Sequence, residues 1–225
     1  MSIEGSITAL VTPMNEKGDL DYSSLEKLIN FQIDSGISGL VAVGTTGESA
    51  TIDFEDHIKL IEFFIKISNG RVHIIAGTGA NSTEEALHLT REAKNLGADA
   101  ALLVSPYYNK PPQEGIYRHH AKIADEVDIP QILYNVPSRT ASFIEPETVQ
   151  RLSSHQNIIG IKDATGDMKN LSEVIKLCKE DIKNKNFFLY SGDDFSSLEF
   201  LQKGGHGTIS VTSNVVPKII SEICM

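Results

Sequence analysis

Eight short apolar runs, spaced at similar intervals along the chain, constrain the fold more than any other feature of the sequence. Each run is rich in β-branched or aliphatic residues and shows little polar alternation, which predicts a strand buried on both faces, as in a parallel sheet. The runs are Ile7–Thr12, Leu40–Val43, His73–Gly77, Ala100–Val104, Gln131–Asn135, Ile158–Lys162, Phe187–Ser191 and Thr208–Val211.

Apolar stripes at helical spacing lie between these runs. Ser23 with Glu26, and Ser82 with Glu85, form predicted capping boxes ahead of two of them, and Gly97 ends the second. The stripes are Leu25/Leu28/Ile29/Ile33, Ala86/Leu89/Ala93/Leu96, Leu171/Val174/Ile175/Cys178 and Phe195/Leu198/Leu201. We expect them to face a common core. Repeated strand–helix alternation predicts an α/β protein with a (β/α)8 barrel, the TIM-barrel architecture. No Pro-, Gly- or Ser-rich linker divides the chain, so we expect one domain over residues 1–225.

Composition excludes several classes of protein. The 225 residues carry 20 Lys and Arg against 30 Asp and Glu, a net charge of −10, and the basic residues are scattered, which argues against nucleic-acid binding. The two cysteines are too few for a disulfide framework and suit a reducing cytoplasm. We find no signal peptide and no apolar stretch of the ~20 residues that a membrane span needs, so a cytoplasmic protein without a membrane partner is expected.

Lys162 stands out because it ends a strand that should be buried. A buried ammonium is costly unless it is paired, and burial lowers its pKa toward the neutral, nucleophilic amine. Such an amine attacks ketones and forms Schiff bases. An ion pair with Asp163 or with a neighbouring glutamate is the structural alternative.

Further candidates follow other strands, where barrel enzymes place their active sites. Tyr134 lies one strand from Lys162 at a corresponding depth and could shuttle protons, or it could be an ordinary core tyrosine. Arg139 suits a substrate carboxylate, with a surface salt bridge as the alternative. The loop Gly44–Ser49 would offer backbone N–H groups to a small anion, but it lacks the ending of a nucleotide P-loop.

Metal chemistry is not expected. The seven histidines are spread along the chain, adjacent His119 and His120 should point to different helix faces, and no His-Glu-x-x-His motif occurs. Asp193 and Asp194 could bind a cation, but a solvated or capping role is favoured.

Five ordered motifs, which extend from the second strand to the loop after the seventh, resemble those of the 4-hydroxy-tetrahydrodipicolinate synthases, a family of pyruvate-dependent class I aldolases. The motifs are Gly44-Thr45-Thr46-Gly47-Glu48-Ser49, Tyr107-Tyr108-Asn109, Tyr134-Asn135-Val136-Pro137-Ser138-Arg139-Thr140, Gly160-Ile161-Lys162-Asp163 and Ser191-Gly192-Asp193-Asp194. The resemblance implies that pyruvate condenses with L-aspartate 4-semialdehyde through a lysine Schiff base, without a metal or cofactor.

Residue roles follow from the same resemblance. Lys162 would form the Schiff base, and Tyr134, Thr45 and Tyr108 would relay protons, with Tyr108 reaching the site of a neighbouring subunit. The residues implied in substrate binding are Thr46 for the pyruvate carboxylate, Arg139 for the semialdehyde carboxylate, and Gly192 and Ile209 beside the lysine. Arg139 and the second threonine of the Gly44 motif favour the synthase over sialic-acid and keto-deoxy-sugar lyases of the same superfamily.

Many members of the family are inhibited by L-lysine at a dimer interface, and this chain has matching positions. They are Ser49, Ala50, His57, Gly79, Asn81, Glu85 and Tyr107. Glu85 suits the amine of lysine, and Asn81 with Tyr107 suits its carboxylate. Phe54 stands where lysine-sensitive relatives often have a histidine. The alternative for Glu85 is its capping role beside Ser82.

The length departs from the family. Members continue past the eighth strand with a full eighth helix and further C-terminal helices, and here Pro217–Met225 supplies about two helical turns. The barrel is therefore expected to be truncated after the eighth strand. Assembly as a homotetramer, a dimer of dimers, is implied for the full enzyme. An inactive barrel remnant and a phosphate-binding barrel isomerase are the alternatives from other classes.

Overall fold

The computed structural model describes residues 3–225, and these form a closed barrel in which eight parallel strands pair in chain order. The strands are β1 Gly5–Ala9, β2 Gly39–Ala42, β3 His73–Gly77, β4 Ala100–Val104, β5 Gln131–Asn135, β6 Ile158–Asp163, β7 Phe188–Ser191 and β8 Gly207–Ser210. Each of the eight runs expected from the sequence overlaps one of these strands, with ends that differ by up to three residues. The (β/α)8 prediction is confirmed.

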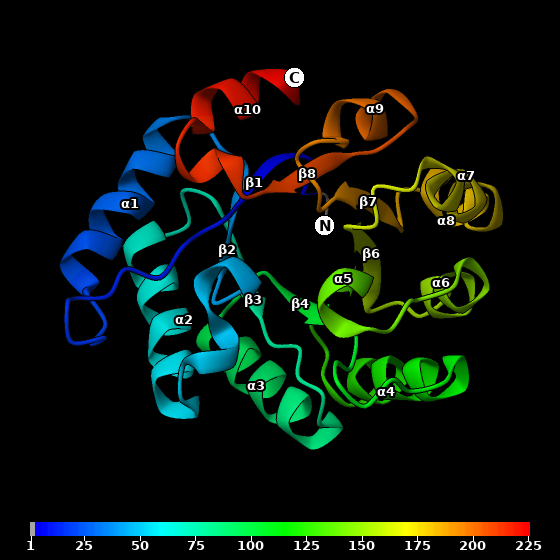
Figure 1. Ribbon diagram of the computed structural model, residues 1–225, viewed down its shortest axis with the longest axis horizontal. Coiled ribbons are helices and arrows are strands. Elements are labelled where there is room, and N and C mark those ends of the chain that lie inside the picture. Colours follow the sequence, from blue (N-terminus) through cyan, green and yellow to red (C-terminus); the bar gives the residue numbers. More distant parts are fainter. Residues whose placement is uncertain (1–2) are drawn as a thin grey trace.

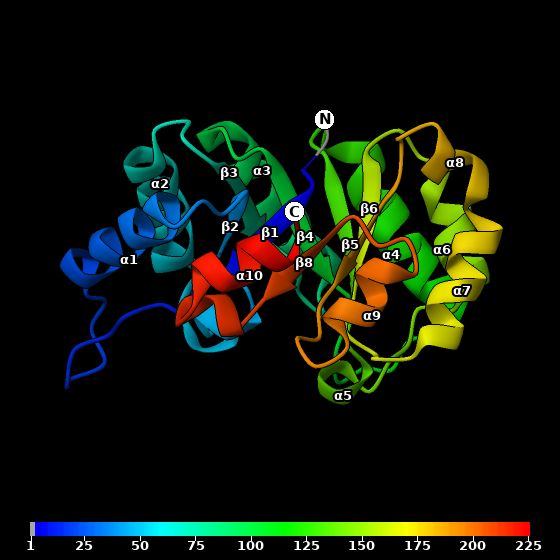
Figure 2. The same cartoon turned by 90° about the horizontal axis from the view of Figure 1, so that it is seen from above.

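Helices surround the strands on the outside of the barrel (Figure 1). They are α1 Tyr22–Asp34, α2 Phe54–Ser68, α3 Thr83–Leu96, α4 Gln113–Glu126, α5 Pro137–Thr140, α6 Pro146–Ser153, α7 Met168–Leu177, α8 Lys179–Lys183, α9 Ser197–Gln202 and α10 Pro217–Ile223, with single 3-10 turns η1 Thr45–Gly47, η2 Ser49–Thr51 and η3 Thr212–Asn214. Seen from the side, α5 projects beyond the strands at one end of the barrel and α8 lies at the other (Figure 2). None of the helices described is long and apolar enough to cross a membrane.

Two layers of core hold the barrel together. Inward-facing side chains such as Ile7, Ile75 and Tyr190 fill its interior, while outward-facing ones such as Leu40 and Leu133 pack beneath the helices. Parallel strands alternate their side chains between these two layers, which explains why the runs are apolar throughout.

Helix capping differs in one place from the prediction. Ser82 caps α3, where its hydroxyl accepts from the Glu85 N–H at 3.4 Å, and Gly97 ends that helix at φ 93°, as expected. The first helix is capped by Asp21 and not by Ser23: the Asp21 carboxylate accepts from the Ser24 N–H at 3.0 Å and from its hydroxyl at 2.6 Å. The predicted Ser23–Glu26 capping box is therefore wrong, because a carboxylate earlier in the chain satisfies the N–H groups first.

The predicted stripe on α9 is also wrong. Phe195 and Leu198 are exposed, and Phe200 is the side chain that enters the core. The helix spans only six residues, so a single position faces the barrel.

After β8 the chain forms the seven-residue helix α10, in the place where about two helical turns were expected. Its Ser221 hydroxyl donates to the Gly36 carbonyl at 2.7 Å, which ties α10 to the end of α1. Ile219 and Ile223 on its outer side are exposed.

Candidate active site

Lys162 and Tyr134 lie side by side inside the barrel, near the carboxyl ends of β6 and β5. The register of the two strands pairs Tyr134 with Lys162, and the Lys162 Nζ lies 4.1 Å from the centroid of the Tyr134 ring. Lys162 is 4% exposed. The sequence placed both residues correctly, at equal depth on adjacent strands.

The surroundings of Lys162 favour the neutral amine. Burial is the main reason that its pKa is lowered to about 7; the charge of Asp194 opposes this shift, and the charge of Arg139 adds to it. No ion pair with Asp163 forms, because Asp163 points outward and accepts from the Thr165 hydroxyl at 2.6 Å and the Asn170 amide at 2.5 Å. An amine poised near neutral pH can attack a carbonyl carbon without a separate base.

Tyr134 is linked to the loop after β2. Burial raises the pKa of Tyr134, while a hydrogen bond with the Thr45 side chain and the charge of Arg139 partly offset that rise. Thr45 opens the turn η1 two residues after Val43, a buried β-branched residue at φ 53°. This unfavourable backbone conformation turns the chain sharply at the barrel mouth and presents Thr45.

The remaining predicted substrate residues line the same end of the barrel. Arg139 lies on the short helix α5, with its side chain exposed, and Thr46 belongs to η1. Gly192 presses its backbone on Lys162: a Cβ atom at this position would lie 2.8 Å from the Lys162 Cε. Ile209, on β8, is fully buried in the inner core.

Tyr108 does not reach Lys162 within this chain. Its side chain is 85% exposed, and its φ of 70° is a left-handed backbone conformation that points it out of the β4–α4 loop. The neighbouring Tyr107 is half-buried, and burial together with the Glu85 charge raises its pKa.

A cavity of 430 Å³ opens beside the mouth of the barrel and joins two groups of predicted residues. Thr45, a predicted proton-relay residue, and Arg139, a predicted substrate-binding residue, form part of its wall. Six of the seven candidate lysine-binding positions also line it, namely Ser49, Ala50, His57, Gly79, Glu85 and Tyr107. Lys162 lies deeper, outside this cavity.

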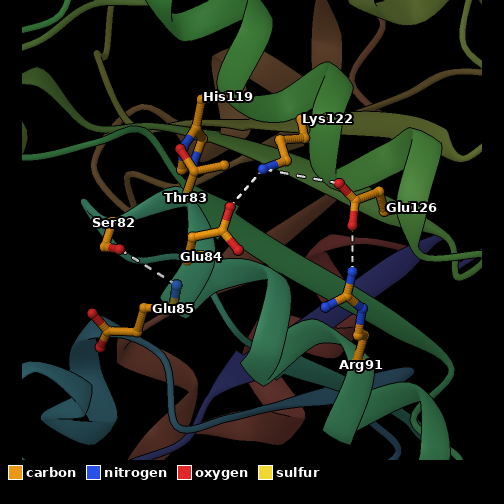
Figure 3. A network of polar contacts seen from close by, with 8 residues as sticks. All are labelled: Ser82, Thr83, Glu84, Glu85, Arg91, His119, Lys122 and Glu126. Atoms are coloured by element: carbon orange, nitrogen blue, oxygen red, sulfur yellow. Dashed lines mark hydrogen bonds and ion pairs between the residues drawn. The ribbon is translucent and has the colours of Figure 1, made fainter.

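Asn81, the seventh of these positions, contacts the cavity wall through its backbone, which forms a hydrogen bond with Tyr107. His57 is buried, its Nε2 lies 2.7 Å from the Gly77 carbonyl oxygen, and burial lowers its pKa. The Glu85 backbone N–H is used by the Ser82 cap, while its carboxylate lies away from the ion pairs that join Glu84, Lys122, Glu126 and Arg91 (Figure 3). The capping role and a binding role of Glu85 are therefore compatible.

Several residues that support the site were not predicted. The Thr12 hydroxyl donates to the Gly47 carbonyl at 2.7 Å and so ties β1 to the Thr45 turn. Asp194 accepts from the β8–η3 segment. A single threonine or aspartate in a loop looks the same in the sequence whether it is solvated or hydrogen-bonded, so these contacts could not be predicted.

Residues 3–225 contain no group of three His, Cys, Asp or Glu side chains placed to hold a metal ion. Asp193 accepts from the Ser196 N–H at 3.1 Å and from its hydroxyl at 2.6 Å, and so holds the turn before α9. The N-cap residue of α9 is Ser196, which has no side-chain capping bond.

Comparisons with known proteins agree with this geometry. A model of the dihydrodipicolinate synthetase family matches residues 2–225. The 4-hydroxy-tetrahydrodipicolinate synthase of Alcanivorax borkumensis is 54% identical over 99% of this chain and 74% of its own length. The crystal structure of the Acinetobacter baumannii dihydrodipicolinate synthase complexed with pyruvate is 52% identical, with a TM-score of 0.94 over 99% of this chain and 75% of that one.

A more distant solved relative, the enzyme of Cyanidioschyzon merolae with lysine bound, is 38% identical, with a TM-score of 0.92 over 98% of this chain and 74% of that one. The match to the family model spans nearly the whole chain and agrees with the buried lysine and the barrel. The chain therefore belongs to the dihydrodipicolinate synthetase family.

Proposed function

We propose that this chain condenses pyruvate with L-aspartate 4-semialdehyde to give 4-hydroxy-tetrahydrodipicolinate, and that Lys162 forms the Schiff base. The activity is that of a lyase in lysine and diaminopimelate biosynthesis. The observation that carries the proposal is a buried lysine with a pKa of about 7, beside a tyrosine at the carboxyl end of the barrel.

Lys162 acts first. Its neutral amine forms a bond to the ketone carbon of pyruvate, and the carbinolamine loses its hydroxyl as water to give an iminium. Loss of a methyl proton then gives the enamine, whose carbon attacks the aldehyde of the second substrate. The amine of that substrate closes the ring on the former ketone carbon and displaces Lys162, which is free for the next turnover.

Tyr134 and Thr45 move the protons of these steps. The Tyr134 hydroxyl, linked to the Thr45 side chain, lies close enough to donate to the departing hydroxyl and to take protons back. Tyr108 completes the relay in a neighbouring subunit, a role that its exposure in this chain supports. The proposal therefore includes a homotetramer built from dimers.

Arg139, Thr46 and the backbone at Gly192 and Ile209 hold the substrates. Arg139 lies at the rim, where a guanidinium suits the semialdehyde carboxylate, and Thr46 offers its hydroxyl to the pyruvate carboxylate. These local donors bind the carboxylate groups of both substrates on a chain whose net charge is −10.

L-Lysine is the proposed inhibitor, bound in the 430 Å³ cavity. Glu85 supplies a carboxylate for the lysine amine, and Tyr107 supplies a hydroxyl for its carboxylate. Isothermal titration with lysine tests this site: Glu85→Gln should weaken binding at least tenfold, with Glu84→Gln as the control outside the cavity. No heat of binding at millimolar lysine in the unaltered protein would refute it.

One domain over residues 1–225 and a cytoplasmic location complete the proposal. The cytoplasmic location is supported by Cys178 and Cys224, both of which are free thiols.

Trapping the Schiff base tests the function. The protein is incubated with pyruvate, reduced with borohydride and mapped by mass spectrometry, and the adduct should lie on Lys162. Tyr134→Phe keeps the ring beneath the amine but removes the proton relay, so it should still be trapped while its kcat falls about 10²- to 10⁴-fold. An unmodified Lys162 in folded protein would overturn the proposal, and turnover with a sugar aldehyde in place of aspartate semialdehyde would favour a lyase of the same superfamily.

A further inference from the structure

Asp194 is a partly buried carboxylate in the segment after β7, and the catalytic scheme above gives it no role. It follows β7 by three residues, in the segment that begins with Gly192. The Gly192 backbone lies directly on the Lys162 side chain, because a Cβ atom there would be 2.8 Å from Lys162 Cε. Asp194 is therefore carried by the part of the chain that packs on the reacting lysine.

The Asp194 carboxylate is fixed by the segment after β8. Its Oδ2 accepts from the Val211 N–H at 3.0 Å, the Thr212 N–H at 2.8 Å and the Thr212 hydroxyl at 2.9 Å. Burial alone raises the pKa of Asp194, but these bonds, with a further one from the Ser210 side chain, outweigh burial and lower it. The group therefore stays ionised at neutral pH.

Lys162 has few charged neighbours. Arg139 from α5 is a positive charge that opposes its protonation, whereas Asp194 is a negative charge that favours it. The hydroxyls of Tyr134 on β5 and Tyr190 on β7 also face the barrel interior, and both remain neutral because burial raises their pKa values. Asp163 faces outward and is held by Thr165 and Asn170.

Asp194 acts on Lys162 through its charge. Its Oδ2 is occupied by η3, so it does not take the proton that the amine must lose. The iminium formed from Lys162 and pyruvate carries a positive charge that a neutral carbinolamine lacks, and a preoriented negative charge lowers the free energy of such a state.

We propose that Asp194 is a positioning residue whose fixed negative charge stabilises the Lys162 iminium against the repulsion of Arg139. This inference rests on the proposed Schiff-base function and deepens it. As water leaves the carbinolamine, its nitrogen lone pair becomes the second C–N bond, and the new positive charge is balanced across the site by the carboxylate.

Asp194→Asn tests the proposal because it removes the charge and keeps an oxygen that can accept from Thr212. Imine formation with pyruvate is measured by cyanoborohydride trapping from about pH 5 to about pH 9. The pH midpoint of trapping should fall by about one unit, because the ammonium loses a stabilising charge. Above the midpoint the dissociation constant of the pyruvate imine should rise about tenfold, because the iminium loses the same charge and the neutral free amine does not.

Two matched variants separate charge from structure. Asp193→Asn removes the adjacent carboxylate, which accepts a hydrogen bond from Ser196, and Thr212→Val removes one hydrogen bond to Asp194 but leaves its charge. Both should keep the midpoint of the unaltered protein. If Asp194→Asn does not fold, Asp194→Ser offers a neutral acceptor and must show the same shift.

The outcomes distinguish the two proposals. Absence of an adduct on Lys162 in the unaltered protein would overturn the proposed function itself. A normal adduct, together with a midpoint and imine stability that Asp194→Asn and Asp194→Ser leave unchanged, would overturn only the role of Asp194. Equal shifts in Thr212→Val and Asp194→Asn would also overturn it, since they would assign the effect to the hydrogen bonds.

Discussion

Burial of Lys162 favours the neutral amine that the proposed function needs, and it also opposes folding. In the unfolded chain this amine has the usual pKa of a lysine, about 10.4, and in the fold burial lowers the pKa to about 7. The folded state therefore binds the proton less tightly than the unfolded state. This difference destabilises the fold fully below about pH 7, and the destabilisation fades as the pH rises from about 7 toward the unfolded value.

Lys162→Met should abolish turnover and stabilise the protein. The variant keeps an unbranched side chain of similar length without the charge, so its free energy of unfolding should exceed that of the unaltered protein by a few kcal/mol at about pH 6. The gain should largely disappear by about pH 10. Urea denaturation at both pH values measures it, and a gain that is equal at both would contradict the assigned pKa.

At the scale of single elements, capping of the helix ends contributes to the free energy of unfolding. α1 begins at Asp21, whose carboxylate accepts from the Ser24 N–H, whereas Ser23 is exposed and caps nothing. Asp21→Ala should lower the free energy of unfolding by about 1 kcal/mol, and Ser23→Ala should change it by less than about 0.5 kcal/mol. Thermal unfolding of the pair measures both. A larger loss of stability for Ser23→Ala would instead support the Ser23–Glu26 capping box predicted from the sequence.

The α3–α4 contact contains two buried histidines. The side chains of His119 and Thr83 lie next to each other (Figure 3), and His119 Nδ1 is 2.9 Å from the Thr83 hydroxyl. The His119 and His120 rings meet edge to face, with centroids 5.0 Å apart. Neither ring nitrogen of His120 has a hydrogen-bond partner within residues 3–225. Burial lowers the pKa of His119 to about 4 and lowers that of His120 as well.

These histidines should make the protein sensitive to acid. Both are neutral in the fold but gain a proton in the unfolded chain below about pH 6.5, so stability is lost as the pH falls from about 6.5 toward 4. His120→Leu should raise the free energy of unfolding by about 1–3 kcal/mol, and by more at pH 5 than at pH 8. Denaturant titrations at these two pH values test it, with the exposed His88 replaced by Leu as the control. If His120→Leu changed the free energy of unfolding equally at both pH values, the histidines would not be the cause of the acid sensitivity.

Across the whole molecule, the barrel is closed where its first and last strands meet. β1 pairs with β8, and Gln32 of α1 reinforces the join: its Oε1 accepts from the Thr8 hydroxyl at 2.7 Å, and its Nε2 donates to the Ser213 carbonyl at 2.8 Å. Asn214, which follows β8, adds two bonds to the end of β1 and the residues after it, accepting from the Val11 N–H and donating to the Ala9 carbonyl.

Gln32→Leu should weaken this closure. The variant fills the space but leaves the Thr8 hydroxyl and the Ser213 carbonyl unpaired in the core, at a cost of about 2–4 kcal/mol in the free energy of unfolding. Hydrogen exchange should rise first in β1 and β8. Gln202→Ala, at an exposed position, is the control and should be neutral. Uniform exchange across all eight strands would mean that Gln32 does not act at the join.

The sequence by itself determined the barrel and the placement of Lys162 beside Tyr134. Continuous apolar runs indicate strands that are buried on both faces. A lysine at the end of such a strand is removed from solvent, which is costly, so Lys162 could be singled out from the sequence. Tyr134 followed from strand order, because parallel strands end at a common edge.

Tertiary structure alone decided which polar side chains meet across the loops. The single core contact of α9 through Phe200, the Thr12–Gly47 bond and the placement of Asp194 beside η3 depend on how distant parts of the chain converge. Local periodicity reports which face of an element is buried. It does not predict which loops contact each other, because those contacts depend on packing between residues that are far apart in the sequence.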